Sequence, residues 1–188
     1  MRRESQPADL CEGGARYVRL VGLPRDRTLV LRAAVPSDQT VLDEMLWMAH
    51  TWRERPHPPC PTRLPDGTRE YAASFGRTGD HGVIAQRGQR VAGAAWWRHR
   101  TAANPGYGYI ADDIPELTVG VRPEYRRQGV ASAMLSWLEA EAARLGIRAL
   151  SLSVEHDNPA RHLYRKAGYS PAGGDEGTLT LCLHHSDL

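Results

Sequence analysis

The 188-residue sequence contains few cysteines and no long hydrophobic run. Its three cysteines, Cys11, Cys60 and Cys182, are odd in number and form no CxxC pair, which argues against a disulfide framework and against a zinc ribbon. No stretch approaches the roughly 20 apolar residues of a membrane helix, and residues 1–11 lack the apolar segment of a signal peptide. We therefore expect a cytoplasmic protein that does not bind membranes.

The sequence also lacks a strong charge of either sign, because 24 basic and 22 acidic residues leave a formal net charge of +2. A charge this small does not imply a nucleic-acid partner. The eight histidines show no HxxxH or HxH spacing, so we expect no metal site. No GxSxG or Walker lysine motif is present, which argues against a hydrolase and against a P-loop enzyme.

The polar residues 1–27 contain only short apolar pieces, and we interpret them as a loosely ordered N-terminal leader. Residues 17–21 within this leader could still pair as an edge strand. Residues 28–188 are predicted to form a single domain, since domains usually hold roughly 100 to 200 residues. Inside it, residues 55–67 contain five prolines and are expected to be a loop.

Hydrophobic periodicity predicts an α/β domain with a mixed, mostly antiparallel sheet. The first half of the domain is expected to be antiparallel and includes a hairpin over residues 81–97 with a tight turn. Residues 131–145 form an amphipathic helix between strands at 116–121 and 149–154, and such a helical crossover makes a parallel pair. The remaining predicted elements are strands at 28–34 and 178–183, and helices at 41–50, 68–76 and 159–167.

The turn between the strand at 116–121 and the following helix has the chemistry of an anion site. Free backbone N–H groups and the positive end of the helix dipole would face a phosphate here. Gly129 would let the backbone approach that phosphate closely, and Arg126 and Arg127 would add charged donors. The segment reads Arg126, Arg127, Gln128, Gly129, Val130 and Ala131.

This segment resembles the pyrophosphate signature of the GCN5-related N-acetyltransferases, which is Arg or Gln, two residues, Gly, one residue, then Gly or Ala. Residues 116–126 resemble the fourth strand of that family, and residues 158–169 resemble its later helix and the turn that follows. The resemblance is firm over 116–169 and looser over 28–97. It implies helices on both faces of the sheet and a splay between strands 116–121 and 149–154.

The resemblance also implies acetyl-CoA as cosubstrate. Its pantetheine arm would pair with the backbone of Val119 and Val121. Its pyrophosphate would bind the backbone at Gln128, Gly129, Val130 and Ala131, with Arg126 and Arg127 nearby. Asn158 matches an Asn that touches the cofactor in relatives, although its place before Pro159 makes helix capping a sufficient explanation. The acceptor site would be built by the first helices and by variable loops, here residues 51–80.

Two side chains match proton-transfer positions of the family. Tyr164 would return a proton to the CoA thiolate, and the alternative is a half-buried packing tyrosine. Glu116 would take a proton from the acceptor amine, directly or through water, and the alternative is a solvated glutamate at a strand edge. Asp112 and Asp113 lie just before it and would help to attract a cationic amine, unless they belong to a solvated acidic loop.

The sequence therefore indicates an N-acetyltransferase that moves an acetyl group from acetyl-CoA to a primary amine of a small molecule or peptide, by direct attack in a ternary complex. The alternative from another class is a non-catalytic sensor that binds acyl-CoA. A nucleic-acid module using the Arg-rich leader and residues 98–100 ranks last, because no basic stripe with interleaved aromatics is present. The sequence does not identify the acceptor or the oligomeric state, and a homodimer is one possibility.

Overall fold

The computed structural model describes residues 18–19, 28–53 and 60–184, and in this part of the chain one sheet has the strand order β1-β2-β3-β4-β5-β6-β8-β7. The strands are β1 (Val18–Arg19), β2 (Leu29–Ala33), β3 (His81–Arg87), β4 (Arg90–Arg98), β5 (Glu116–Val121), β6 (Ala149–Glu155), β7 (Ser170–Gly174) and β8 (Thr178–His184). The helices are α1 (Gln39–His50), α2 (Asp66–Arg69), α3 (Val130–Arg144) and α4 (Ala160–Lys166).

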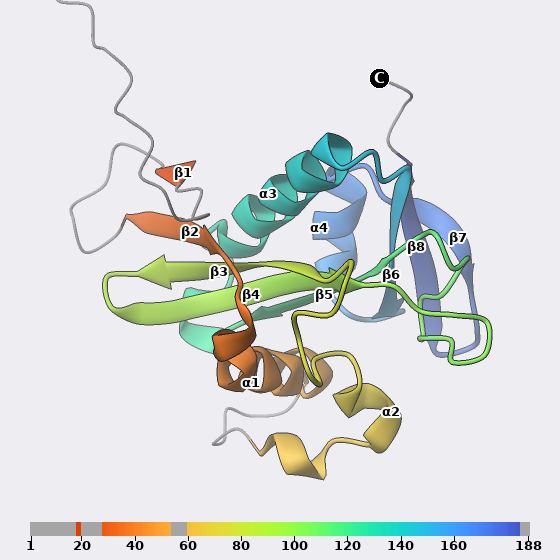
Figure 1. Cartoon of the computed structure of the whole chain (residues 1–188), viewed down its shortest axis with the longest axis horizontal. Coiled ribbons are helices and arrows are strands. Elements are labelled where there is room, and N and C mark those ends of the chain that lie inside the picture. The colour runs from red at the N-terminus through yellow and green to blue at the C-terminus, as the bar shows by residue number, and fades with distance from the viewer. Residues whose placement is uncertain (1–17, 20–27, 54–59, 185–188) are drawn as a thin grey trace, which may run out of the picture.

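The predicted mixed, mostly antiparallel sheet is confirmed. Neighbouring strands pair antiparallel except β5 and β6, which are parallel. Figure 1 shows α1 and α2 on one face of the sheet and α3 and α4 on the other. The predicted edge strand in the leader is present as Val18–Arg19, which pairs with β2. The rest of the predicted leader lies outside the described residues.

One strand was missed from sequence and one helix was misplaced. β7 was not predicted, because its residues SPAGG have the composition of a turn and all five are exposed. It is a strand because it pairs with β8 along the edge of the sheet. The predicted helix at 68–76 is shorter and earlier, since α2 covers Asp66–Arg69 and is followed by turns. In the proline-rich loop a 3-10 turn forms at Pro61–Arg63, and residues 54–59 are not described.

The sheet is splayed between β5 and β6, as expected. These strands pair only at Glu116 and Ser151, next to the bond from Ser151 N–H to the carbonyl of Pro115 (3.1 Å). In Figure 1, β6, β8 and β7 turn away from the direction of β2 to β5. The edge of β5 beyond Glu116 is therefore not covered by β6.

The pairing of β5 with β4 determines which of its residues point their backbone N–H and C=O groups toward this edge. Arg122 N–H donates to the carbonyl of Ala92, the residue of β4 beside it (3.0 Å). Successive residues of a strand point their backbone groups to opposite sides, so the N–H and C=O of Val119 and Val121 point away from β4. These are the two residues expected to pair with the pantetheine arm.

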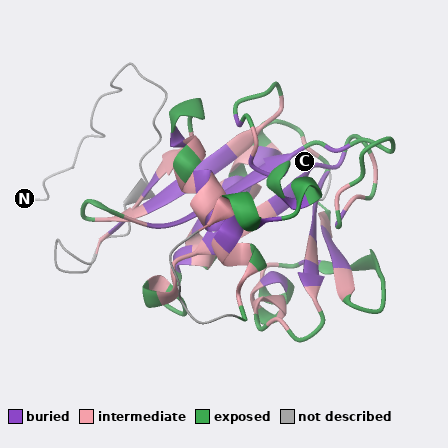
Figure 2. Ribbon diagram, turned by 90° about the horizontal axis from the view of Figure 1, so that it is seen from below, coloured by how far each residue is buried: buried purple, intermediate pink, exposed green. Residues whose placement is uncertain are grey.

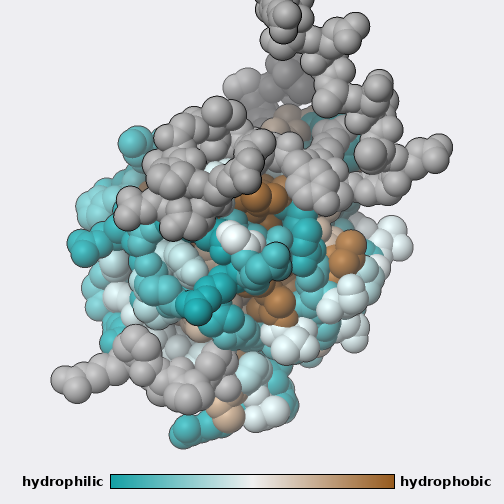
Figure 3. Space-filling model, turned by 90° about the vertical axis from the view of Figure 1, so that its left-hand side faces the viewer, coloured by the Kyte–Doolittle hydropathy of each residue, from teal (hydrophilic) through white to brown (hydrophobic). Residues whose placement is uncertain are grey.

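The core consists of one cluster on each face of the sheet, and β4 alternates between them. Trp96 packs with α1 and the segment after α2, whereas Trp97 packs with α3. Both tryptophans are buried, and their ring N–H groups donate to the carbonyls of Tyr71 and Gly79. Figure 2 shows the buried residues following the central strands. On the side drawn in Figure 3, the coloured surface is mostly hydrophilic with small hydrophobic patches.

A buried ion pair fixes the segment after α2 against the sheet. The side chains of Arg98 and Asp80 are 4% and 3% exposed, and their nearest charged atoms are 2.6 Å apart. The same guanidinium donates to the carbonyls of Glu70 (2.7 Å) and Ala73 (2.9 Å). These bonds hold residues 70–73 in place, and with them the side chain of Tyr71.

We predict that Asp80→Ala lowers the free energy of unfolding by about 3 to 5 kcal/mol, because it leaves the Arg98 guanidinium buried without its counter-ion. Urea denaturation followed by circular dichroism measures the change. The matched control is Asp66→Ala, which breaks the exposed pair with Arg69 and should move the midpoint little. Equal effects of the two substitutions would contradict the prediction.

Candidate active site

A cleft of about 630 Å³ follows the open edge of β5. Its walls come from β5 and β6, from the start of α3, from α4, from the end of α1, and from the segments around Tyr71 and Tyr107. Of the residues predicted as functional, the cleft brings together Glu116, Val119, Val121, Arg126, Arg127, Gly129, Val130, Ala131, Asn158 and Tyr164. Gln128 is the predicted site residue that does not line it.

The start of α3 forms one end of the cleft. The first turn of a helix carries N–H groups that have no partner within the helix, and here residues 129–132 line the cleft. Gly129 has φ +79, which favours glycine, and a Cβ placed there would meet no atom within 4 Å. The backbone conformation therefore favours glycine, and open space lies in front of it. This geometry suits an anion bound at the helix terminus.

Arginine side chains surround this helix terminus. Arg126 donates from Nε to the carbonyl of Val121 (3.1 Å) and from Nη2 to that of Met48 (3.4 Å). Burial lowers the pKa of Arg126. Among the described residues neither Arg126 nor Arg127 has a carboxylate within ion-pair distance, so their charge is available to an anion. Gln128 instead bonds to Arg87 and to the carbonyl of Glu124.

Asn158 lies at the cleft and also caps a helix. Its Oδ1 accepts a hydrogen bond from the backbone N–H of Ala160 (2.9 Å) at the start of α4. Pro159 already has helical backbone angles, with φ −62 and ψ −16. The capping interpretation is therefore confirmed, and contact with a cofactor stays a prediction.

Tyr164 lies on α4 and is 8% exposed, yet it lines the cleft. Its ring meets that of Tyr169 edge-on, with centroids 5.9 Å apart. Burial raises the pKa of Tyr164 to about 12, so the phenol stays protonated at neutral pH. The residue therefore combines the packing role with the state needed by a proton donor.

Glu116 is 3% exposed, so the alternative of a solvated strand-edge glutamate is wrong. Its Oε1 accepts hydrogen bonds from the hydroxyl of Tyr71 (2.8 Å) and from the N–H of Gly108 (2.7 Å). Its Oε2 is buried and has no hydrogen-bond partner among the described residues. Burial raises the pKa of Glu116, and the bonds from Tyr71 and Gly108 oppose that rise. A carboxylate in this state is a candidate base.

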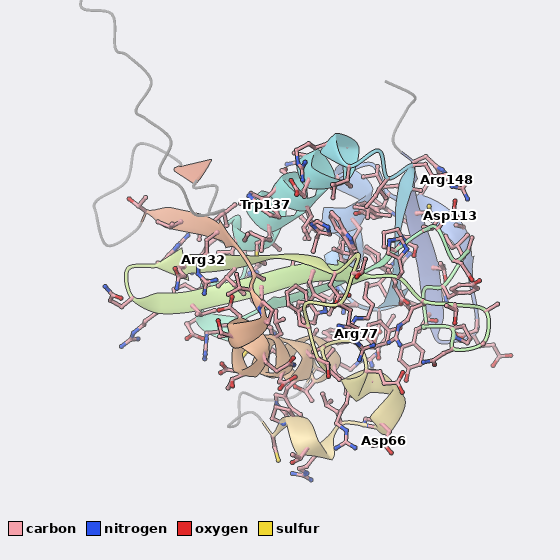
Figure 4. The ribbon with its side chains drawn as sticks, in the orientation of Figure 1. Arg32, Asp66, Arg77, Asp113, Trp137 and Arg148 are labelled. Carbon is pink, nitrogen blue, oxygen red and sulfur yellow. The ribbon has the colours of Figure 1, made fainter. Side chains whose placement is uncertain are left out.

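The two aspartates before Glu116 do not line the cleft. Asp113 pairs with Arg148 (2.7 Å), and Figure 4 shows the two side chains together beside β6. Asp112 accepts hydrogen bonds from the hydroxyl of Tyr109 and from the N–H of Ala102 (3.0 Å). Both belong to the surface structure of the loop, as the acidic-loop alternative expected, and their attraction of a cationic amine stays a prediction.

Sequence reasoning missed aromatic residues of the cleft. Tyr71 and Tyr107 stack with ring centroids 6.0 Å apart. Trp52 also lines the cleft and donates from Nε1 to Glu155 (2.7 Å). Trp52 and Tyr71 lie within the 51–80 segment that was expected to build the acceptor site. Tyr107 comes from the loop between β4 and β5. No periodicity marks any of them, because tertiary packing alone brings them together.

Comparison with known proteins connects this arrangement to a family. Residues 42–169, more than half of the chain, match the model of the Acetyltransferase (GNAT) family. No curated protein sequence matches significantly.

Solved structures of such enzymes share the fold. The GNAT domain of PAT from S. lividans has a TM-score of 0.65 at 20% identity, covering 94% of this chain and 100% of its own. The ribosomal-protein-S18-alanine N-acetyltransferase of Escherichia coli has a TM-score of 0.60 at 20% identity, covering 85% and 96%. A putative acetyltransferase of Salmonella typhimurium, solved with its cofactor acetyl-CoA, has a TM-score of 0.59 at 18% identity, covering 83% and 93%.

Two kinds of feature are absent from the described residues. No group of three or more His, Cys, Asp or Glu side chains is placed to hold a metal ion in the part of the chain that the structure describes. Within those same residues, no helix has the length and apolar character needed to span a membrane.

We predict that Tyr164 ionises near pH 12, whereas a solvated phenol ionises near pH 10. Because burial disfavours the ionised phenol, its pKa lies above the value in the unfolded chain. The free energy of unfolding should therefore fall as the pH rises from about 10 to about 12, where the unfolded chain ionises and the folded chain does not. Ultraviolet difference titration of the parent protein against Tyr164→Phe, after rapid pH jumps, isolates this one group. If the ionisation that is absent from Tyr164→Phe has its midpoint near pH 10 in the parent, the phenol is solvated and the prediction is wrong.

Proposed function

The chain belongs to the GNAT acetyltransferase family, and on that premise we propose that it transfers an acetyl group from acetyl-CoA to a primary amine. The acceptor is a small molecule or a peptide, and the amine attacks the thioester directly in a ternary complex. The observation that carries the proposal is a cleft along β5 that holds a helix terminus suited to an anion, an open strand edge and a buried carboxylate.

The order of these groups along β5 suits an extended cosubstrate. Arg126 and the start of α3 follow one end of the strand, and Glu116 begins the other end. At roughly 3.3 Å per residue, the strand separates them by about 17 Å. The backbone of Val119 points into the cleft between them. A pyrophosphate at the helix terminus would therefore leave an extended arm lying along β5, with its reactive end near Glu116 and Tyr164.

The residues fit acetyl-CoA in charge as well as in position. Arg126 and Arg127 lack carboxylate partners among the described residues and would face the pyrophosphate. Residues 129–131 would supply backbone N–H groups to the pyrophosphate. The backbone N–H of Gln128 would join them if it faced the same phosphate. The N–H of Val119 would polarise the thioester carbonyl. Acetyl-CoA supplies the activated acyl group, and no metal is required for its transfer.

The acceptor end is suited to an amine. Glu116 Oε2 lies buried with no protein donor in the described chain, and a buried polar atom of this kind requires a hydrogen-bond partner. The negative charge of Glu116 suits an ammonium group in the cleft, whose proton would reach the carboxylate through water. Tyr71 and Tyr107 add aromatic walls that favour an apolar or cationic group beside the amine.

The chemistry needs two proton transfers. Glu116 takes a proton from the ammonium, directly or through water, because only the neutral amine can attack the carbonyl carbon. The new C–N bond forms as the C–S bond breaks. Tyr164 donates its hydroxyl proton toward the departing sulfur and recovers a proton afterwards.

We predict that Ala131→Glu weakens CoA binding at least 100-fold in calorimetry, because it puts a carboxylate where the pyrophosphate would bind. Glutamate is favoured in the first turn of a helix, so the variant should fold. Ala131 is a better test position than Gly129, whose positive φ would add strain. The control is Ser136→Glu, which adds the same charge to an exposed position farther along α3. Unchanged CoA affinity in Ala131→Glu would refute this anion site.

We predict that Tyr164→Phe and Glu116→Gln each lower the acetyl-transfer rate by a factor of about 10² to 10⁴ while CoA affinity stays within about threefold. The loss in Glu116→Gln should be largest below the pKa of the acceptor amine and should recover at higher pH. An amine panel scored by thiol release provides the assay. Parent rates and pH profiles in both variants would rule out proton transfer by these residues. CoA binding without transfer to any amine would favour the sensor alternative.

A further inference from the structure

The hydroxyl of Tyr71 lies at the junction of two structural elements near the cleft. It donates a hydrogen bond to Glu116 Oε1 (2.8 Å) and accepts one from the backbone N–H of Tyr107 (2.6 Å). Tyr71 is 7% exposed and lines the cleft. One phenol therefore connects β5 to the loop between β4 and β5.

The same loop packs directly on the carboxylate. The N–H of Gly108 donates to Glu116 Oε1 (2.7 Å), so two donors hold this oxygen. A Cβ at Gly106 would lie 1.8 Å from Glu116 Oε2, and one at Gly108 would lie 2.9 Å from Oε1. Only residues without side chains fit at these two places. The contacts leave Oε2 as the oxygen without a donor among the described residues.

Tyr71 itself is held from three sides. The guanidinium of Arg100 lies over its ring at 4.3 Å, and the ring of Tyr107 stacks on it with an interplanar angle of 8°. Its carbonyl accepts the ring N–H of Trp96 (2.7 Å). These contacts fix both the backbone and the ring plane, so the hydroxyl has a defined position. A group held this firmly can orient the side chain to which it is bonded.

We propose that Tyr71 is a positioning residue, which fixes Glu116 through Oε1 and holds the carboxylate in place, in its ionised form, as the base for the acceptor amine. The inference rests on the proposed function of Glu116 as base. Tyr71 does not exchange a proton with substrate in this account. It acts through the carboxylate, and it also ties the loop that covers the carboxylate to the sheet.

Few charged groups surround the pair of Tyr71 and Glu116. Arg100 is the cation that acts on both, and its Nη1 pairs with Glu70 (3.2 Å). Arg98, opposite Glu116 on β4, is neutralised by Asp80. On β6 the paired residue is the uncharged Ser151. The bond from Tyr71 is therefore a main stabiliser of the ionised carboxylate.

Loss of that bond shifts the pKa of Glu116 in a definite direction. The Tyr71 hydroxyl stabilises the ionised form and so holds the pKa of Glu116 below the value that burial alone would give. Its removal should raise the pKa of Glu116, so that a higher pH is needed to form the base. A hydrogen bond to an ionised group corresponds to about one to two pKa units.

The test is Tyr71→Phe, which keeps the ring and removes only the hydroxyl. We expect the acidic limb of the kcat/KM profile for the amine to move up by about one to two pH units, with the KM for acetyl-CoA unchanged. Tyr109→Phe is the matched control, because that hydroxyl lies in the same loop and donates to Asp112 instead. A uniform rate loss with an unmoved pH profile would overturn the proposal.

A second measurement does not depend on catalysis. Carbon-13 titration of the labelled Glu116 carboxyl, assigned with Glu116→Gln, should show the same upward shift in Tyr71→Phe. In the parent protein, the amide signals of Tyr107 and Gly108 should titrate with the midpoint of that carboxyl, which decides the matter if the variant does not fold. The proposal would be overturned if the Tyr107 amide did not titrate with Glu116 in the parent protein. It would also be overturned if the Glu116 midpoint did not move in Tyr71→Phe. If no amine is acetylated, the proposed role of Glu116 as a base is wrong. The carbon-13 and amide titrations would still test whether Tyr71 positions its carboxylate.

Discussion

The parallel strands β5 and β6 are joined at a single position, Glu116 and Ser151, and every feature of the cleft depends on their separation beyond it. Backbone groups in a protein interior require hydrogen-bond partners. Along the exposed edge of β5, the carbonyl of Val121 is taken by Arg126, and the backbone of Val119 points into the cleft. A continuous sheet would satisfy these groups internally and leave no space for a ligand. Because the strands separate, β5 lacks hydrogen bonds to β6 there, and its backbone groups can bind a ligand instead.

The cleft carries opposite charges at its two ends, which are maintained by different means. At the start of α3, the exposed side chains of Arg126 and Arg127 supply the positive charge. Glu116 is 3% exposed and keeps an oxygen without a donor among the described residues. Burial of such a group opposes stability unless it is compensated, and Tyr71 and Gly108 compensate one oxygen only. Buried groups with perturbed pKa values are typical of functional sites.

The sequence predicted those parts of the molecule whose signals are local. β5 has the predicted bounds, and α3 differs from the predicted helix by one residue at each end, because strand alternation, helical spacing and Gly146 are all readable in sequence. The predicted anion site rests on the same short segment and stays a prediction. β7 was missed because pairing with β8 overrides its turn-like composition. The burial of Glu116 and its bond to Tyr71 were also missed, since these residues are 45 positions apart and only the tertiary fold joins them.

The raised pKa of Tyr164 places a condition on its role as acid. A phenol with a pKa of about 12 is a weaker acid than an unperturbed thiol, whose pKa is about 8.5, so in water it would not protonate a thiolate completely. Sulfur leaving in the same apolar cleft is desolvated too, and desolvation raises the pKa of a thiol as it does that of a phenol. The two shifts have the same sign, so burial alone does not widen the mismatch between donor and acceptor. In the proposed reaction, Tyr164 would therefore serve first as a hydrogen-bond donor to the charge that develops on sulfur, and complete proton transfer would follow as that charge grows.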